Sequence, residues 1–224
     1  MEQLLLCFLL LISCFSHAYC TKEQPYNAIF SFGNSYADTG NYITLVKGVL
    51  PYDVFEHLPY GMTYFDQPTG RGCDGRLVVD FIAQNLSLPL VPPYFSKGQD
   101  YHKGVNFAVI GSTALSLDYF RKSISEVKSY VPVVINTTKE AAESLLEQGA
   151  TTIVLPGNLP TGCIPIMLTL YASTNKSDYD HLGCLKHYNT IGYYHNIKLR
   201  EAVVQLQLKY PKAKIIYADY YMSQ

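Results

Sequence analysis

Short apolar runs alternate along the chain with longer segments in which apolar residues recur at helical spacing. Four runs rich in β-prone residues predict strands at 28–32, 104–109, 151–155 and 214–218. Periodic segments predict helices at 78–86, 132–149 and 187–210, the second starting at Pro132 and stopping at Gly149. Strands separated by helices predict an α/β fold with a parallel sheet and helices on both faces.

Two small residues follow predicted strands at places where a ligand would bind. Ser35 comes after the first strand and Gly111 after the second, and ligands of parallel sheets bind beyond the carboxyl ends of the strands. A serine in a tight turn there, opening a helix, exposes its hydroxyl, and nearby backbone N–H groups can receive an oxyanion. On this segment alone, we favour the alternative that Ser35 only caps a helix.

Composition narrows the classes of function. The chain has 224 residues with 17 basic and 18 acidic side chains, which fits one domain and gives no basic stripe for nucleic acid. Residues 70–75 spell the dinucleotide fingerprint but do not follow a strand, so we interpret the match as chance. No Cys-x-x-Cys pair, Walker-type loop or His-Glu-x-x-His motif occurs, and we expect neither a metal nor a cofactor.

The N-terminus carries an unbroken apolar run at residues 4–12, followed by small residues up to Ala18. The run is shorter than the roughly 20 residues that span a bilayer. Its pattern predicts a signal peptide over residues 1–18 and a secreted domain over 19–224, without a stable membrane anchor. A buried N-terminal helix is the alternative, but no polar residue divides the run into faces.

Secretion changes how cysteines and asparagines are interpreted. Four cysteines remain after cleavage: Cys20, Cys73, Cys163 and Cys184. They allow three pairings, and an oxidising compartment favours disulfides over a metal site. Three N-x-[ST] sequons are candidate glycosylation sites: Asn85, Asn136 and Asn175.

Residues 32–41, Phe-Gly-Asn-Ser-Tyr-Ala-Asp-Thr-Gly-Asn, resemble the first block of the plant GDSL esterase/lipases, members of the SGNH hydrolase superfamily. Further matching stretches follow in the family's order over nearly the whole mature chain, at 70–83, 88–94, 104–115, 154–163 and 217–221. The resemblance implies a flavodoxin-like parallel sheet and hydrolysis of small-molecule or lipid carboxylic esters.

Site residues carry over position by position. Ser35 matches the family's nucleophile, and its backbone N–H and that of Gly111 match two oxyanion donors. Asn34 stands where the family name has Asp, but that carboxylate is not the family's proton acceptor. The resemblance also implies a Cys163–Cys184 disulfide.

Two family features are not found. The Gly-x-Asn-Asp of the third block, which supplies an oxyanion Asn, is absent where Leu115 runs almost directly into Ile124. No Asp-x-x-His follows the last predicted strand before Gln224. We therefore expect a partial domain without one central strand and the C-terminal part, and a chain that is catalytically incomplete.

No other histidine in the sequence matches the position of the family's missing base. Asp178 and His181 form a literal Asp-x-x-His, but they precede the long helix, so we interpret them as a polar loop. The remaining candidates are interpreted as surface or packed histidines: His57, His102, His187 and His195. Two hypotheses remain: a secreted esterase acting through Ser35, and a secreted non-catalytic relative.

Overall fold

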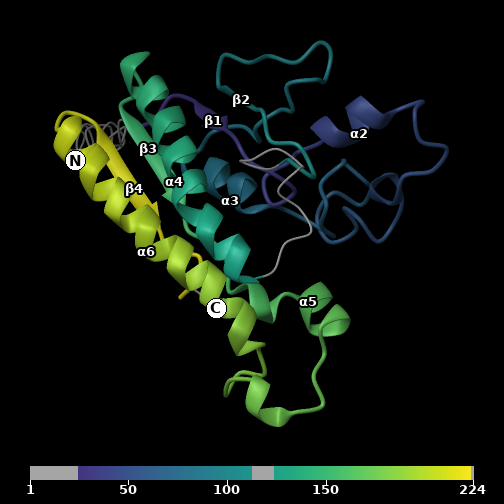
Figure 1. Cartoon of the computed structure of the whole chain (residues 1–224). Coiled ribbons are helices and arrows are strands. Elements are labelled where there is room, and N and C mark those ends of the chain that lie inside the picture. The colour runs from purple at the N-terminus through teal and green to yellow at the C-terminus, as the bar shows by residue number, and fades with distance from the viewer. Residues whose placement is uncertain (1–24, 113–123, 223–224) are drawn as a thin grey trace, which may run out of the picture. The chain divides into compact units, whose positions relative to one another are not determined.

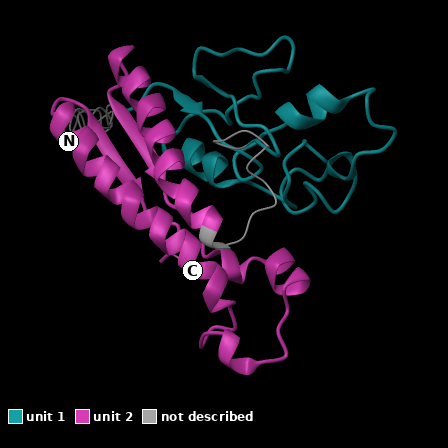
Figure 2. Ribbon diagram, in the orientation of Figure 1, with its two compact units in different colours: residues 1–112 teal, residues 113–224 magenta. Residues whose placement is uncertain are grey.

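Pairs of parallel strands organise the computed structural model, which describes residues 25–112 and 124–222 (Figure 1). The chain divides into two units, Met1–Ser112 and Thr113–Gln224 (Figure 2). β1 (Ile29–Ser31) pairs with β2 (Gly104–Asn106) in unit 1, and β3 (Thr152–Pro156) pairs with β4 (Lys214–Ala218) in unit 2. The predicted parallel α/β character is confirmed, but the described strands form two two-stranded sheets instead of one.

Helices connect the strands in both units. Unit 1 contains α2 (Asn41–Val46), the 3₁₀ turn Val54–Glu56 and α3 (Val78–Asn85). Unit 2 contains α4 (Ile124–Glu147), α5 (Pro165–Leu170), α6 (Lys186–Lys209) and the 3₁₀ turns Thr161–Cys163 and Lys176–Asp178. None of the described helices is long and apolar enough to cross a membrane. The predicted signal peptide, residues 1–18, lies outside the described residues.

The prediction that a helix begins at Pro132 was wrong, because Pro132 lies inside α4. Proline commonly starts helices because it lacks the N–H that an interior residue donates. Here the apolar face runs through the proline: Val131 and Ile135 are 4% and 7% exposed and pack with Leu199 of α6. Burial of this face against α6 accounts for the continuous helix.

The core of unit 2 lies between its sheet and its two long helices. Ile153 and Ile215 are register partners and pack with Leu206 of α6, which is fully buried. Figure 1 shows α4 and α6 running along β3 and β4. Val154, whose side chain points to the opposite face, is 49% exposed. Within the described part of unit 2, both long helices therefore cover the same face of the sheet, whereas the sequence predicted helices on both.

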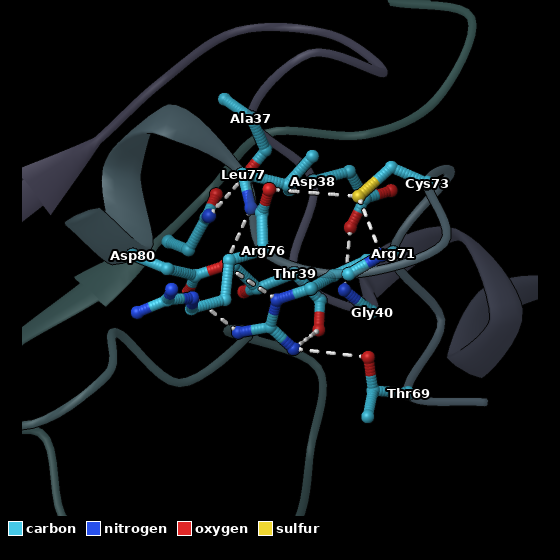
Figure 3. Close-up of polar contacts among 12 residues, drawn as sticks. Ala37, Asp38, Thr39, Gly40, Thr69, Arg71, Cys73, Arg76, Leu77 and Asp80 are labelled. Atoms are coloured by element: carbon cyan, nitrogen blue, oxygen red, sulfur yellow. Dashed lines mark hydrogen bonds and ion pairs between the residues drawn. The ribbon is translucent and has the colours of Figure 1, made fainter. Parts of the chain in front are cut away.

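Unit 1 has its own apolar cluster and one buried ion pair. The cluster consists of Leu77, Val79, Ala83, Leu88 and Val91, with Ile29 of β1 packed against it. Arg71 donates to both carboxylate oxygens of Asp80 at 2.8 Å, and the two side chains are 7% and 0% exposed (Figure 3). Such two-point pairing fixes orientation as well as distance, and Arg71 Nη1 also donates to the carbonyl of Thr39 at 3.5 Å.

The two cysteines that the family resemblance pairs are bonded to each other in unit 2, Cys163 to Cys184. The same loop is held by Asn189 of α6, whose Oδ1 accepts from Gly162 N at 2.7 Å. Gly162 leaves no room for a Cβ, which would lie 2.1 Å from the carbonyl oxygen of Leu185. Cys73 is a free thiol in the described part of unit 1, and Cys20 lies outside it.

We predict that Leu206→Ala lowers the free energy of unfolding of unit 2 by about 2–5 kcal/mol, because it leaves a cavity in a fully buried site. Leu208→Ala is the matched control on the same helix, since Leu208 is 77% exposed; we expect a change within about 0.5 kcal/mol. Urea unfolding followed by circular dichroism compares the two. Equal losses would contradict the described core.

Candidate active site

Ser35 lies in a turn that begins three residues after β1. The turn is closed by hydrogen bonds from the amides of Ala37 and Asp38 to the carbonyl of Asn34, both 3.0 Å long. Helix α2 begins only at Asn41, so the prediction that Ser35 opens a helix was wrong. The Ser35 side chain is half-buried, and its hydroxyl has no hydrogen-bond partner among the described residues. It therefore does not act as a helix cap.

Asp38, three residues after Ser35, is the acceptor on which this segment converges. Its Oδ1 accepts from the amides of Gly40 and Asn41 at 2.8 and 2.7 Å. Its Oδ2 accepts from the amides of Tyr42 and Ile110 at 3.0 and 2.8 Å. The side chain is fully buried. One carboxylate therefore joins the chain after β1 to the chain after β2.

Two buried asparagines reinforce this junction. Asn41 Nδ2 donates to the carbonyls of Asn106 and Ala108 at 2.8 and 2.9 Å, and its Oδ1 accepts from Phe95 N at 3.0 Å. Asn106 Oδ1 accepts from Ala108 N at 2.7 Å, while its Nδ2 donates to the carbonyl of Ala37. Both asparagines are fully buried. Their carboxamides provide partners for backbone groups that no longer pair between strands.

Gly111 lies at the same end of the β1–β2 sheet as the Ser35 turn. Beyond the strands the two segments stay side by side, because Phe107 N donates to Ser31 O at 2.8 Å and Val109 N to Gly33 O at 3.2 Å. Gly111 is exposed and has a φ of +85°, a conformation that favours glycine. The structure thus brings the Ser35 turn and Gly111 together at the carboxyl ends of two parallel strands.

Known proteins resemble this chain in sequence. A model of the GDSL-like lipase/acylhydrolase family matches residues 29–130 and 116–224. The chain belongs to that family. It is 36% identical over 282 residues to GDSL esterase/lipase At1g28600 of Arabidopsis thaliana, an alignment covering 96% of this chain and 71% of the relative. It is 35% identical over 263 residues to the sinapine esterase of Brassica napus, covering 89% and 67%.

The match to the GDSL-like family is split. Its two parts overlap between residues 116 and 130, next to the place where the sequence lacks the third block. The alignment with the Arabidopsis relative is longer than the 224 residues of this chain, so that relative carries residues without a counterpart here. Residues 113–123 lie outside the described residues.

In the described part of unit 1, no histidine is hydrogen-bonded to Ser35. His57 is exposed and stacks on Tyr52 with ring centroids 4.6 Å apart, and His102 is exposed as well. A GDSL hydrolase needs a base that removes the proton from its serine. The described residues of unit 1 do not supply one at hydrogen-bonding distance.

The Asp-x-x-His of unit 2 does not form a bonded pair in the described structure. His181 is exposed, and the carboxylate of Asp178 instead accepts from the Ser173 hydroxyl and from Asn175. The neighbouring Asp180 accepts from the amides of Cys184 and Leu182, and the Cys184 bond contributes most to lowering the pKa of Asp180. This agrees with the interpretation as a polar loop.

His195 on α6 is oriented by its neighbour Asn196, and no sequence motif predicted this contact. Asn196 is 3% exposed; its Oδ1 accepts from Asn158 N at 2.7 Å and its Nδ2 donates to Asn158 O at 2.9 Å. Because these bonds fix which atom is the oxygen, His195 Nδ1, 3.2 Å from it, carries the proton. Burial lowers the pKa of His195. In the neutral form of this ring, Nε2 is then the nitrogen that accepts.

All three sequon asparagines are exposed, the condition required for a glycan. Asn85 ends α3, and Asn136 lies in α4 with its Nδ2 donating to Glu140 at 2.6 Å. Asn175 precedes the 3₁₀ turn Lys176–Asp178 and accepts from the amide and the hydroxyl of Ser177. Glycosylation stays a prediction at each position.

We predict that unit 2 loses stability as the pH falls below about 6.5, the ordinary pKa of histidine. Below that pH, His195 binds a proton in the unfolded chain but not in the folded chain, because its pKa is lowered in the folded chain. Protonation therefore favours unfolding. The loss ends once the pH is below the folded pKa. The protection factors of the α6 amides in hydrogen exchange, compared between pH 7 and 5, measure this loss.

His195→Gln should reduce the pH dependence of those protection factors. His187→Gln, an exposed position on the same helix, is the matched control and should leave it unchanged. An unchanged pH dependence in His195→Gln would contradict the role of His195.

Proposed function

We propose that this chain is a carboxylic ester hydrolase of the GDSL type with Ser35 as its nucleophile. The observation that carries the proposal is the junction at Asp38, which holds the Ser35 turn against the segment that ends at Gly111. Family membership supports ester chemistry, because both relatives' names contain the term esterase and the family's description contains the term lipase.

In the proposed reaction, the Ser35 hydroxyl oxygen attacks the carbonyl carbon of the ester. The carbonyl oxygen becomes an oxyanion, which accepts hydrogen bonds from the backbone N–H groups of Ser35 and Gly111. The alcohol leaves with a proton, and the acyl group stays on Ser35 until water hydrolyses it. The substrate class is a small-molecule or lipid carboxylic ester.

The base decides how fast this chain can react. Removing the base in a triad enzyme costs about 10⁶ in rate, whereas removing one oxyanion donor costs about 10²–10³. Because no histidine bonds to Ser35 in the described residues of unit 1, we expect the 224-residue chain alone to turn over esters very slowly. The same observation favours a second candidate function, a non-catalytic relative that binds esters.

We further propose that the protein is secreted after cleavage behind Ala18 and carries glycans at one or more of Asn85, Asn136 and Asn175. The apolar run at residues 4–12 supports the first part. The exposure of all three asparagines supports the second.

We predict that the purified 224-residue chain hydrolyses p-nitrophenyl butyrate no faster than its Ser35→Ala variant. Turnover that is lost in both Ser35→Ala and His181→Ala would show instead that Asp178 and His181 form a catalytic dyad, with His181 as the base. Turnover lost only in Ser35→Ala would indicate another histidine, with His195 tested next.

A chimera tests the nucleophile itself. Adding to this chain the residues of the Arabidopsis relative that have no counterpart here should give hydrolysis that Ser35→Ala lowers by at least about 10³. A folded chimera that is active without Ser35 would overturn the assignment of the nucleophile. A folded chimera without activity would favour the non-catalytic function.

A further inference from the structure

We propose that Asp38 is a positioning residue for the nucleophile: its carboxylate keeps the backbone N–H groups of Ser35 and Gly111 close enough to bind one oxyanion. The inference rests on the proposed function, which gives these two N–H groups that role. Asp38 itself is buried and contacts neither substrate nor reacting atoms.

Asp38 bonds to residues that lie next to each of the two donors in the sequence. On one side, its amide closes the turn that contains Ser35, through the bond to Asn34 O. On the other side, its Oδ2 accepts from Ile110 N, 72 residues away in sequence and directly before Gly111. The side chain therefore links the segment that follows the Ser35 turn to the residue directly before Gly111.

A cap alone would not need this arrangement. The donors Gly40, Asn41 and Tyr42 are local to the start of α2, and a serine hydroxyl accepts from such groups at many helix starts. The bond from Ile110 is the one that a capping role leaves unexplained. A carboxylate can fill all four positions because both oxygens only accept, whereas an asparagine would turn an NH₂ group toward two of the donors.

Loss of this carboxylate should misplace Gly111 without unfolding unit 1. Asn41 and Asn106 also join the two segments, through three further hydrogen bonds. They would keep the segments adjacent but would not hold the Ile110 amide. A displacement of about 1 Å at a reacting site can cost about 10² in rate.

The test replaces the nucleophile so that no base is required. In the full chain carrying Ser35→Cys, the thiolate at position 35 attacks p-nitrophenyl acetate, forms a thioester and releases p-nitrophenolate through an oxyanion. The same thiolate displaces iodide from iodoacetamide and forms a thioether without an oxyanion. The ratio of the two rate constants thus reports oxyanion stabilisation independently of thiol exposure and protonation. Peptide mapping distinguishes position 35 from the cysteines outside the disulfide, Cys7, Cys14, Cys20 and Cys73.

With Asp38 intact, we expect this ratio to exceed that of N-acetylcysteine by about 10²–10³, the value of one oxyanion donor. Asp38→Asn should lower it by about 10². Asp38→Ser, which keeps a cap for α2 but cannot reach Ile110, should do the same if Asp38→Asn folds poorly. The control is Val91→Ala, a core change in unit 1 at a residue 2% exposed, which should leave the ratio unchanged.

The outcomes separate the two claims. A ratio equal to that of N-acetylcysteine with Asp38 intact would overturn the proposed oxyanion role of Ser35 and Gly111. A raised ratio that survives in folded Asp38→Asn and Asp38→Ser would overturn only the role of Asp38. Loss of hydrogen-exchange protection throughout unit 1 in both variants would also overturn it, because Asp38 would then be a structural residue.

Discussion

Four backbone N–H groups converge on the two oxygens of one fully buried carboxylate, Asp38, and the proposed site depends on that convergence. β1 and β2 are only three residues long, so pairing between strands stops before the chain reaches Ser35 or Gly111. Backbone groups that leave a sheet inside the protein must find other partners, since an unpaired buried amide is costly. Asp38, with the carboxamides of Asn41 and Asn106, provides those partners and thereby fixes the shape of the turn.

In unit 2, two asparagines hold the segment that follows β3. The segment after β3 is bonded to α6 by Asn196, which both accepts from and donates to the backbone of Asn158. Further along the same loop, Asn189 Oδ1 accepts from the amide of Gly162, beside the Cys163–Cys184 disulfide. Buried polar side chains that bond to the backbone thus hold the segments after a strand in both units. In unit 2 the same contact also orients His195.

Sequence patterns predicted the parts that depend on local chemistry. The four β-prone runs overlap β1 to β4, since each combines apolar side chains with a following turn. The predicted strand at 104–109 was too long because residues 107–109 bond to Ser31 and Gly33 without continuing the ladder. The start of α4 was predicted wrongly at Pro132, because burial against α6 outweighed a local signal.

The Asp38 junction could not be predicted, because its deciding bond joins residues 72 positions apart. The disulfide came from family resemblance and not from the spacing of the cysteines.

Amide hydrogen exchange of Ile110 tests the central claim most directly. If Asp38 holds the segment before Gly111, the Ile110 amide opens only when unit 1 unfolds. Its exchange should then match that of the fully buried Ala83 in α3 and rise equally with denaturant. Exchange of Ile110 that is 100-fold faster than that of Ala83, or independent of denaturant, would show a loosely held loop and would contradict the account.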